Sequence, residues 1–159
     1  MSAPWLTSVT PVGPPTSANP TVRQLLYAGV VTGAWSGIVS LILFGIGRLF
    51  GVPFAVTSGT TTTTVTWWLV LFEPLVIALV AALLSALMRG RRHAGRIVYV
   101  VGTVIAIVSL VGPLIQGIDW PTKILLALMH VVTWFLVVPQ IARIVKDSEP
   151  GRSVERVDE

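Results

Sequence analysis

A single acidic residue within an apolar segment is the feature of this sequence with the clearest chemical meaning. Glu73 lies in Trp67–Arg89, which reads WWLVLFEPLVIALVAALLSALMR and is long enough to cross a membrane. An ionisable side chain in a bilayer costs about 2.5–3.5 kcal/mol, so it normally faces a partner, a cavity or a reaction. Glu73 is therefore either a neutral acid hydrogen-bonded to a neighbouring helix or a functional group.

His130 is the second ionisable side chain expected at this depth. Glu73 lies eight residues after Val65, and His130 lies eight residues after Thr122, where both segments are expected to begin on the same side of the membrane. At 1.5 Å per residue, both side chains would lie ~12 Å below that surface and could meet. Pro74 lacks an amide hydrogen and favours a kink, which would open a cavity beside Glu73.

Other polar and aromatic residues are expected in the same zone. Ser109 and Gln116 share a face of the third apolar segment, and Trp134 follows His130 by one turn. Trp68 fits either the site or an interfacial aromatic belt, whereas Trp35 and Trp134 lie too deep for the belt and either line a cavity or pack. The predicted site has three catalytic residues, Glu73, His130 and Gln116, and five substrate-binding residues, Trp35, Trp68, Trp134, Phe72 and Ser109.

The composition is that of an integral membrane protein. Of 159 residues, 53% are hydrophobic and only 11% are charged. Four apolar segments have the length needed to cross a bilayer, and we predict an all-α, four-helix transmembrane domain over residues 24–142. The predicted helices span residues 24–47, 65–88, 97–117 and 122–142.

Basic residues predict the orientation of this bundle. Arginines are dense in Arg89–Arg96, and Arg143 and Lys146 follow the fourth segment, so the positive-inside rule places these ends and both termini in the cytoplasm. Residues 1–23, with five prolines, and residues 143–159 are predicted to be cytoplasmic tails, the first of them disordered. The arginine cluster could instead bind a nucleic acid or an anionic ligand, but topology and contact with anionic membrane lipid account for it, and we expect no nucleic acid partner.

Small residues predict how the helices pack. They repeat at four-residue spacing in the first and second segments, and such stripes let helices approach closely, although Thr32, Ser36 and Ser40 could instead line a polar path. The stripes are Gly29, Gly33 and Gly37; Thr32, Ser36 and Ser40; and Ala78, Ala82 and Ala86.

The connection between the first two segments is too long for a tight turn. Its residues Pro53–Thr57 and Thr60–Thr64, joined by Ser58 and Gly59, favour a short β-ribbon that would cover the outer face. The alternative is a threonine-rich loop without defined structure.

Several classes of site are excluded. The chain has no cysteine, which removes disulfides and thiolate chemistry, and its two histidines, His93 and His130, are expected at different levels. No phosphate-binding loop, Ser-His-Asp set or zinc spacing is present, so we expect neither a metal nor another cofactor.

Two short motifs carry a resemblance to a known family. The chain reads SLVGPL over residues 109–114 and ALMH over residues 127–130. Together with most of the helical region, they resemble a family of small actinobacterial four-helix membrane proteins of unknown function. The nine arginines against two lysines fit a high-GC bacterium and hence a bacterial cytoplasmic membrane. The resemblance implies the topology and makes His130 part of the family pattern, but it implies no activity, and it does not extend to Glu73.

The predicted function follows from an acid in an apolar, aromatic environment. A carboxylic acid can protonate an alkene or an epoxide, and aromatic faces stabilise the resulting carbocation. We therefore expect an enzyme that cyclises a lipophilic isoprenoid, similar in kind to small membrane-bound terpene cyclases. Glu73 would be the acid, and His130 and Gln116 would orient it or accept a final proton.

Two other functions remain open. The chain could be a small proton-coupled transporter that forms a homo-oligomer, although small exporters carry their membrane glutamate on a different helix. It could also be an accessory subunit of a membrane complex, in which Glu73 makes an interhelical hydrogen bond.

Overall fold

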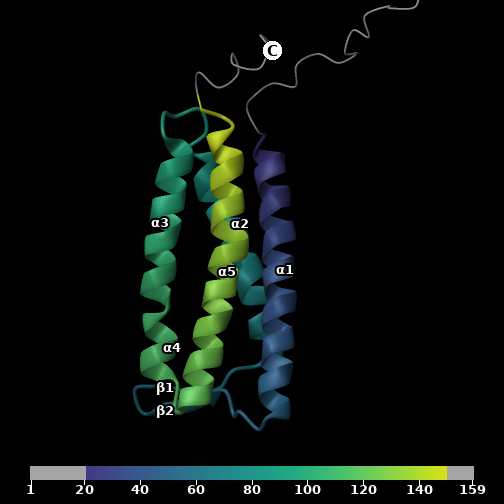
Figure 1. Ribbon diagram of the computed structural model, residues 1–159, viewed down its shortest axis with the longest axis vertical. Helices are drawn as coiled ribbons and strands as arrows, with labels where there is room; N and C mark the ends of the chain where they lie inside the picture. Colours follow the sequence, from purple (N-terminus) through teal and green to yellow (C-terminus); the bar gives the residue numbers. More distant parts are fainter. Residues whose placement is uncertain (1–20, 150–159) are drawn as a thin grey trace, which may run out of the picture.

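The computed structural model describes residues 21–149 (Figure 1), so most of the two predicted tails lies outside it. Its elements are, in order, α1 (Val22–Leu49), β1 (Ala55–Ser58), β2 (Thr61–Thr64), α2 (Trp67–Ala86), α3 (Ala94–Ser109), α4 (Val111–Gln116) and α5 (Trp120–Lys146). Four spans in this part of the chain are long and apolar enough to cross a membrane: α1, α2, α3 with α4, and α5. This confirms a mostly helical, four-span architecture and indicates a multi-pass membrane protein.

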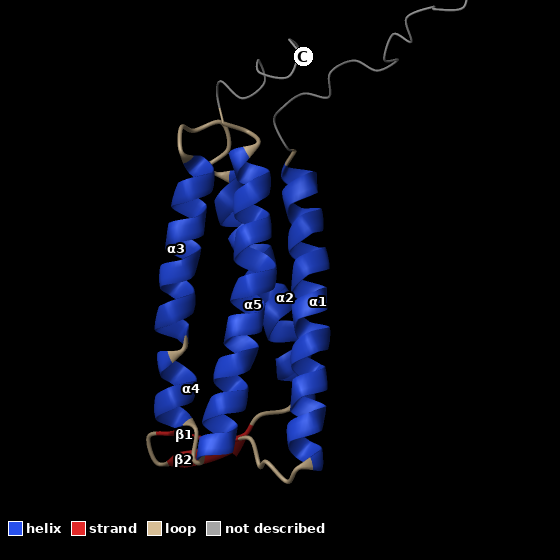
Figure 2. Ribbon diagram, in the orientation of Figure 1, coloured by secondary structure: helices blue, strands red, loops and turns tan. Residues whose placement is uncertain are grey.

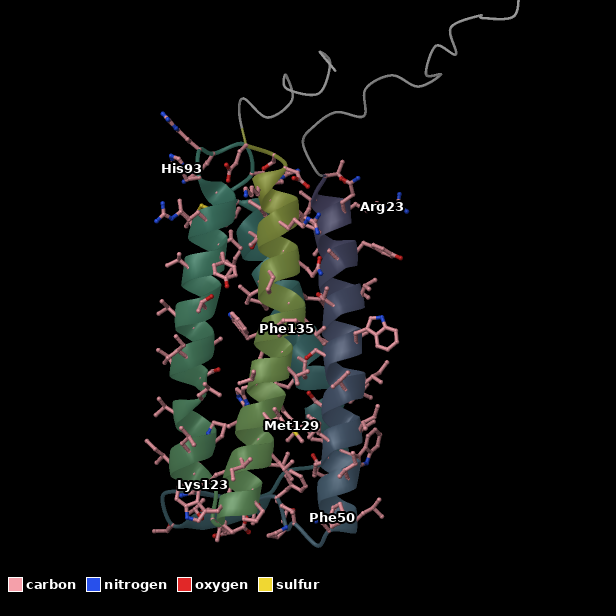
Figure 3. All side chains as sticks on the ribbon, in the orientation of Figure 1. Arg23, Phe50, His93, Lys123, Met129 and Phe135 are labelled. Carbon is pink, nitrogen blue, oxygen red and sulfur yellow. The ribbon has the colours of Figure 1, made fainter. Side chains whose placement is uncertain are left out.

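The helices form an elongated bundle in which α5 lies between α1 and α3 (Figure 1). The second helix, α2, packs mainly on α1 and to a smaller extent on α5. The start of α1 and the end of α5 lie at one end of the bundle, which we call the basic end; Figure 3 marks it by Arg23 and His93. Strands β1 and β2 lie at the opposite, hairpin end, near Phe50 and Lys123 (Figures 2 and 3).

Local sequence explains where the two longest helices begin. Thr21 and Gln24 form a capping box, in which the Gln24 amide donates to Thr21 Oγ1 and the Thr21 amide donates to Gln24 Oε1 at 2.8 Å. At α5, Asp119 accepts from the Thr122 amide at 2.7 Å, and a proline in the first turn has no amide to leave unpaired. Both caps position the long helices that carry the small and polar residues discussed below.

A break after Ser109 divides the predicted helix 97–117 into α3 and α4. Pro113 has no amide hydrogen, so it cannot donate to the carbonyl of Ser109 four residues earlier, and its ring crowds that carbonyl. Leu110 keeps helical backbone angles, φ −66° and ψ −22°, so only the hydrogen-bonding pattern is interrupted there, and α3 and α4 together form one membrane span. By contrast, α2 continues through Pro74 without a break in its assigned helix.

The predicted β-ribbon is present at the hairpin end. β1 and β2 pair antiparallel, with Ala55 opposite Thr64 and Ser58 opposite Thr61. The ribbon is tied to the chain after α4, because Val56 bridges Gly117 and the Ile118 amide donates to the Ala55 carbonyl at 3.2 Å (Figure 2). The connection predicted to cover this end is therefore an ordered cap rather than an unstructured loop.

Phe54 holds this cap to the bundle. Its side chain is fully buried in a cluster that includes Val70 of α2 and Met129 of α5, and its ring lies 4.5 Å from that of Phe44. The residue has a φ of 50°, a left-handed conformation that costs a non-glycine residue energy. Burial of the aromatic ring offsets that cost.

At the basic end, residues after α5 bond the connection between α2 and α3 and the first turn of α3. Ser148 Oγ accepts from the Gly90 amide at 3.2 Å, and Glu149 Oε1 accepts from the Gly95 amide at 2.9 Å. A carboxylate at the first turn of α3 is favourable, because helix amides there lack internal partners. The arginine-rich connection between α2 and α3 is thereby joined to the end of α5.

Candidate functional site

The face of α2 that meets α1 is closely packed through small residues. A Cβ added at Gly33 would lie 2.8 Å from both Ala78 Cβ and Leu75 Cα, and one added at Gly29 would lie 3.0 Å from Ala82 Cβ. These contacts confirm that the glycine and alanine stripes are packing surfaces. This face of α2 therefore positions the helix and has no room for a ligand.

Glu73 lies on a different face of α2. Its neighbour Pro74 is buried toward α1, and one residue along a helix is a rotation of about 100°, so Glu73 is turned away from that interface. Its side chain is exposed, and no hydrogen bond or ion pair joins it to another residue of 21–149. The candidate acid therefore faces the surroundings of the bundle.

The depth of Glu73 follows from contacts between helices. Val70, one turn before Glu73, packs in the same cluster as Leu126 and Met129 of α5. The helices α2 and α5 run in the same direction (Figure 1). The Val70 contacts therefore put Glu73 at a depth similar to that of His130. The two side chains are not hydrogen-bonded to each other.

His130 is partly buried and bonded within its own helix. Its Nδ1 lies 2.8 Å from the carbonyl oxygen of Leu126. A carbonyl only accepts, so Nδ1 carries the hydrogen in this contact, and Nε2 of the neutral ring is left as an acceptor. His130 could thus accept a proton at Nε2, but it offers Glu73 no hydrogen from that atom unless the ring is charged.

Two predicted cavity residues instead join or stabilise helices. Trp134 Nε1 donates to Thr103 Oγ1 on α3 at 3.1 Å, and Ser109 Oγ donates to the Ala106 carbonyl one turn earlier at 2.7 Å. Their polar groups are therefore engaged by the protein itself. A comparable pair, Ser36 and Thr133, joins α1 to α5 at 2.8 Å.

The remaining predicted site residues lie on the surface of the bundle. Trp35, Trp68 and Phe72 are 60%, 50% and 51% exposed, and Gln116 is also exposed. Phe72 is next to Glu73 in the chain, whereas Trp35 belongs to α1. The structure therefore does not gather the predicted catalytic and aromatic residues around one enclosed cavity.

Trp35 lines a surface groove between α1 and α5. The groove has a volume of about 430 Å³ and is mostly apolar, with amide and phenol groups nearer the basic end. Its lining includes Gln24, Tyr27 and Gln140, which sequence reasoning did not select. The signal in the sequence was a glutamine at an end of each of two apolar segments, Gln24 in the first and Gln140 in the fourth.

A second groove, of about 390 Å³, lies at the hairpin end beside Arg48, Thr66 and Trp67. Neither of these two grooves is lined by Glu73, His130 or Gln116. Within residues 21–149, no three histidine, aspartate or glutamate side chains lie close enough together to hold a metal ion.

The comparison with protein families identifies the chain. Residues 20–147 match a family of unknown function, DUF6069. The chain belongs to the DUF6069 family. The match covers all five helices and the ribbon up to the end of α5.

The other comparisons add no named relative to this family assignment. Neither the curated proteins nor the solved structures gave a match.

Proposed function

We propose that this protein is a subunit of a membrane assembly, and that it binds its partner through the outward face of α2 with Glu73 as the polar contact. One observation carries the proposal: Glu73 is exposed within a membrane-spanning helix and has no partner among the described residues. A carboxyl group facing lipid costs about 2.5–3.5 kcal/mol. A hydrogen-bonding group on another chain would remove much of that cost.

The surroundings of Glu73 support a protein contact more than a reaction. Phe72 and Ile77 beside it are 51% and 47% exposed, so the acid lies on an open apolar surface. A carbocation must be kept from water and other nucleophiles, which requires an enclosed site. Helices in membranes associate through packing of such open faces, and a polar side chain there can add an interhelical hydrogen bond.

The test compares complexes extracted from membranes in mild detergent. Wild type, Glu73→Leu and the matched control Val101→Leu, on the exposed face of α3, would be expressed as full chains and sized by native mass spectrometry. We expect wild type and Val101→Leu to run as the same complex and Glu73→Leu to shift toward the single chain. An unchanged complex in Glu73→Leu would contradict the proposal.

The acid-initiated isoprenoid cyclase is a second candidate, favoured by the similar depths of Glu73 and His130. It requires that an assembled complex enclose the two groups. Membranes carrying wild type or Glu73→Gln would be given an epoxidised prenyl substrate, and product formed only by wild type would support it. No product from any isoprenoid tested would remove this candidate.

We also propose that the basic end faces the cytoplasm of a bacterial cell. Arg91, Arg92 and Arg96 at this end are exposed. Among residues 21–149, only two basic residues, Arg48 and Lys123, lie near the hairpin end, which is the asymmetry of the positive-inside rule. A cysteine at Arg92 should react with an impermeant maleimide only after the cells are opened. A cysteine at Gly59 in the ribbon turn should react in intact cells, and the reverse pattern would contradict the orientation.

A further inference from the structure

We infer that α2 pairs with α2 of a second copy of this chain, through a seam formed by Glu73, Ile77, Val80 and Leu84. The inference rests on the proposed function, because it names the partner of the same surface. It makes the protein a homodimer whose polar contact is a pair of Glu73 side chains.

The spacing of the four seam residues is that of a helix pair. They follow one another at intervals of four, three and four residues, the alternation that keeps one stripe facing a partner in left-handed helix pairs. The stripe extends for ~16 Å along the helix. Such a stripe is suited to a parallel or antiparallel neighbour that crosses at a small angle.

No described helix covers this seam. Ile77, Val80 and Leu84 are 47%, 48% and 59% exposed, and Glu73 is exposed as well. The residues that α2 does bury fall on other positions, namely Val70, Pro74, Ala78, Ala82 and Ser85. The chain therefore uses one stripe of α2 for its own fold and leaves the seam open, together with the adjacent Val76 and Leu83.

The chemistry of the seam matches a second copy of itself. In a dimer with a two-fold axis, each residue near the axis faces the same residue of its partner, so the seam must complement itself. Isoleucine, valine and leucine do so by packing, and a carboxyl group does so because its protonated form is both donor and acceptor. Two Glu73 side chains that meet near the axis can thus hydrogen-bond each other when one of them carries a proton.

The positions of the charges favour this partner. In residues 21–149, lysines and arginines lie in the connections or in the first and last turns of helices, as with Arg23, Arg48 and Lys123. A two-fold axis along the membrane normal places each residue at the same depth as its copy in the partner. The mid-helix carboxyl groups therefore meet each other, and the basic ends remain at the membrane surface. A second copy therefore supplies a matching group at the required depth.

The absence of cysteine makes the seam testable by disulfide cross-linking. Single cysteines would be placed at Ile77, Val80 and Leu84, and at the comparably exposed off-seam positions Val76 and Leu83, in the full chain in native membranes. We expect oxidation to give several-fold more covalent dimer at the three seam positions than at the two controls. Equal yields at all five positions, or no dimer at the seam, would overturn the inference.

The role of Glu73 is tested on the Val80→Cys background. Glutamine can both donate and accept, so Glu73→Gln should keep the cross-link, whereas Glu73→Leu should weaken association about threefold to thirtyfold. Undiminished cross-linking in Glu73→Leu would show that the carboxyl pair does not form.

The outcomes separate the two proposals. If the seam cysteines give no dimer but Glu73→Leu still reduces the native complex, the partner is a different membrane protein and only this inference fails. If neither measurement responds, both proposals fail.

Discussion

Helix α2 has one buried stripe, which packs on α1, and one exposed stripe, and the two are built from different residues. Toward α1, Ala78 and Ala82 meet glycines so closely that no side chain could be added. On the outward stripe, Ile77 and Val80 are about half exposed, and Glu73 has no partner within 21–149. Small residues thus define the fold of the single chain, whereas larger apolar residues and one acid remain for contacts outside it.

Among contacts within the single chain, the largest loss of stability is expected from Phe54→Ala. Phe54 is fully buried beside Val70 and sets the connection from α1 to α2, and truncating a buried phenylalanine costs about 3–5 kcal/mol. Reversible unfolding in mixed micelles should show this loss. A loss below about 1 kcal/mol would mean that the hairpin end does not hold the two helices together.

Gly37→Ala should be the next most damaging change. The added Cβ would collide with the carbonyl oxygen of Leu71, a backbone atom that cannot rotate away, and overpacking of this kind costs about 1–3 kcal/mol. Gly45→Ala on the same helix is the control, because nothing lies within 4 Å of its added Cβ. Equal stabilities of the two variants would contradict the close approach of α1 and α2.

On the open stripe, Glu73→Leu should leave the fold of the single chain intact. Removing a carboxyl group that faces lipid relieves a cost of about 2.5–3.5 kcal/mol in membrane insertion, so the monomer should be as stable as wild type or more stable. The same unfolding assay, run at dilution in detergent, measures this. A clear destabilisation would mean that Glu73 makes an internal contact, and the distinction between the two stripes would fail.

The smallest effect is expected from Ser36→Ala. Its hydroxyl bonds Thr133 across the α1–α5 interface at 2.8 Å, and Thr133 keeps a second bond to the Met129 carbonyl. Interhelical hydrogen bonds in membranes average about 0.6 kcal/mol, so the loss should be of that order. Thr103→Val, which removes the acceptor of Trp134, should behave alike, and a loss above about 2 kcal/mol in either would show that polar pairs hold the bundle.

Much of the fold could be predicted from the sequence, because each rule needed only neighbouring residues. Apolar length gave four spans, the spacing of Gly29, Gly33 and Gly37 gave a helix contact, and threonine-rich residues around Gly59 gave the ribbon. The third predicted helix is one apolar span, in which the hydrogen-bonding pattern is interrupted at Leu110, close to Pro113. A proline alone does not predict such an interruption, because α2 continues through Pro74.

The candidate site was less predictable, because a residue's depth does not fix the direction of its side chain. Counting residues placed Glu73 and His130 at similar depth, in agreement with the packing of Val70. It could not tell that α1 would take the stripe next to Glu73 and leave the acid exposed. Nor could it tell that Trp134 would be held by Thr103, since that bond depends on how α3 packs against α5.

Lipid exposure of Ile77 is the measurement that tests the central claim most directly. A spin label at Ile77→Cys, and one at the equally exposed Val101→Cys on α3, would be compared for collision with oxygen dissolved in the bilayer. We predict that the label at Ile77 is shielded in the wild-type background and becomes accessible with Glu73→Leu, while the label at Val101 is accessible in both. Equal accessibility of the two labels without the Glu73 change would contradict a covered, Glu73-dependent face on α2.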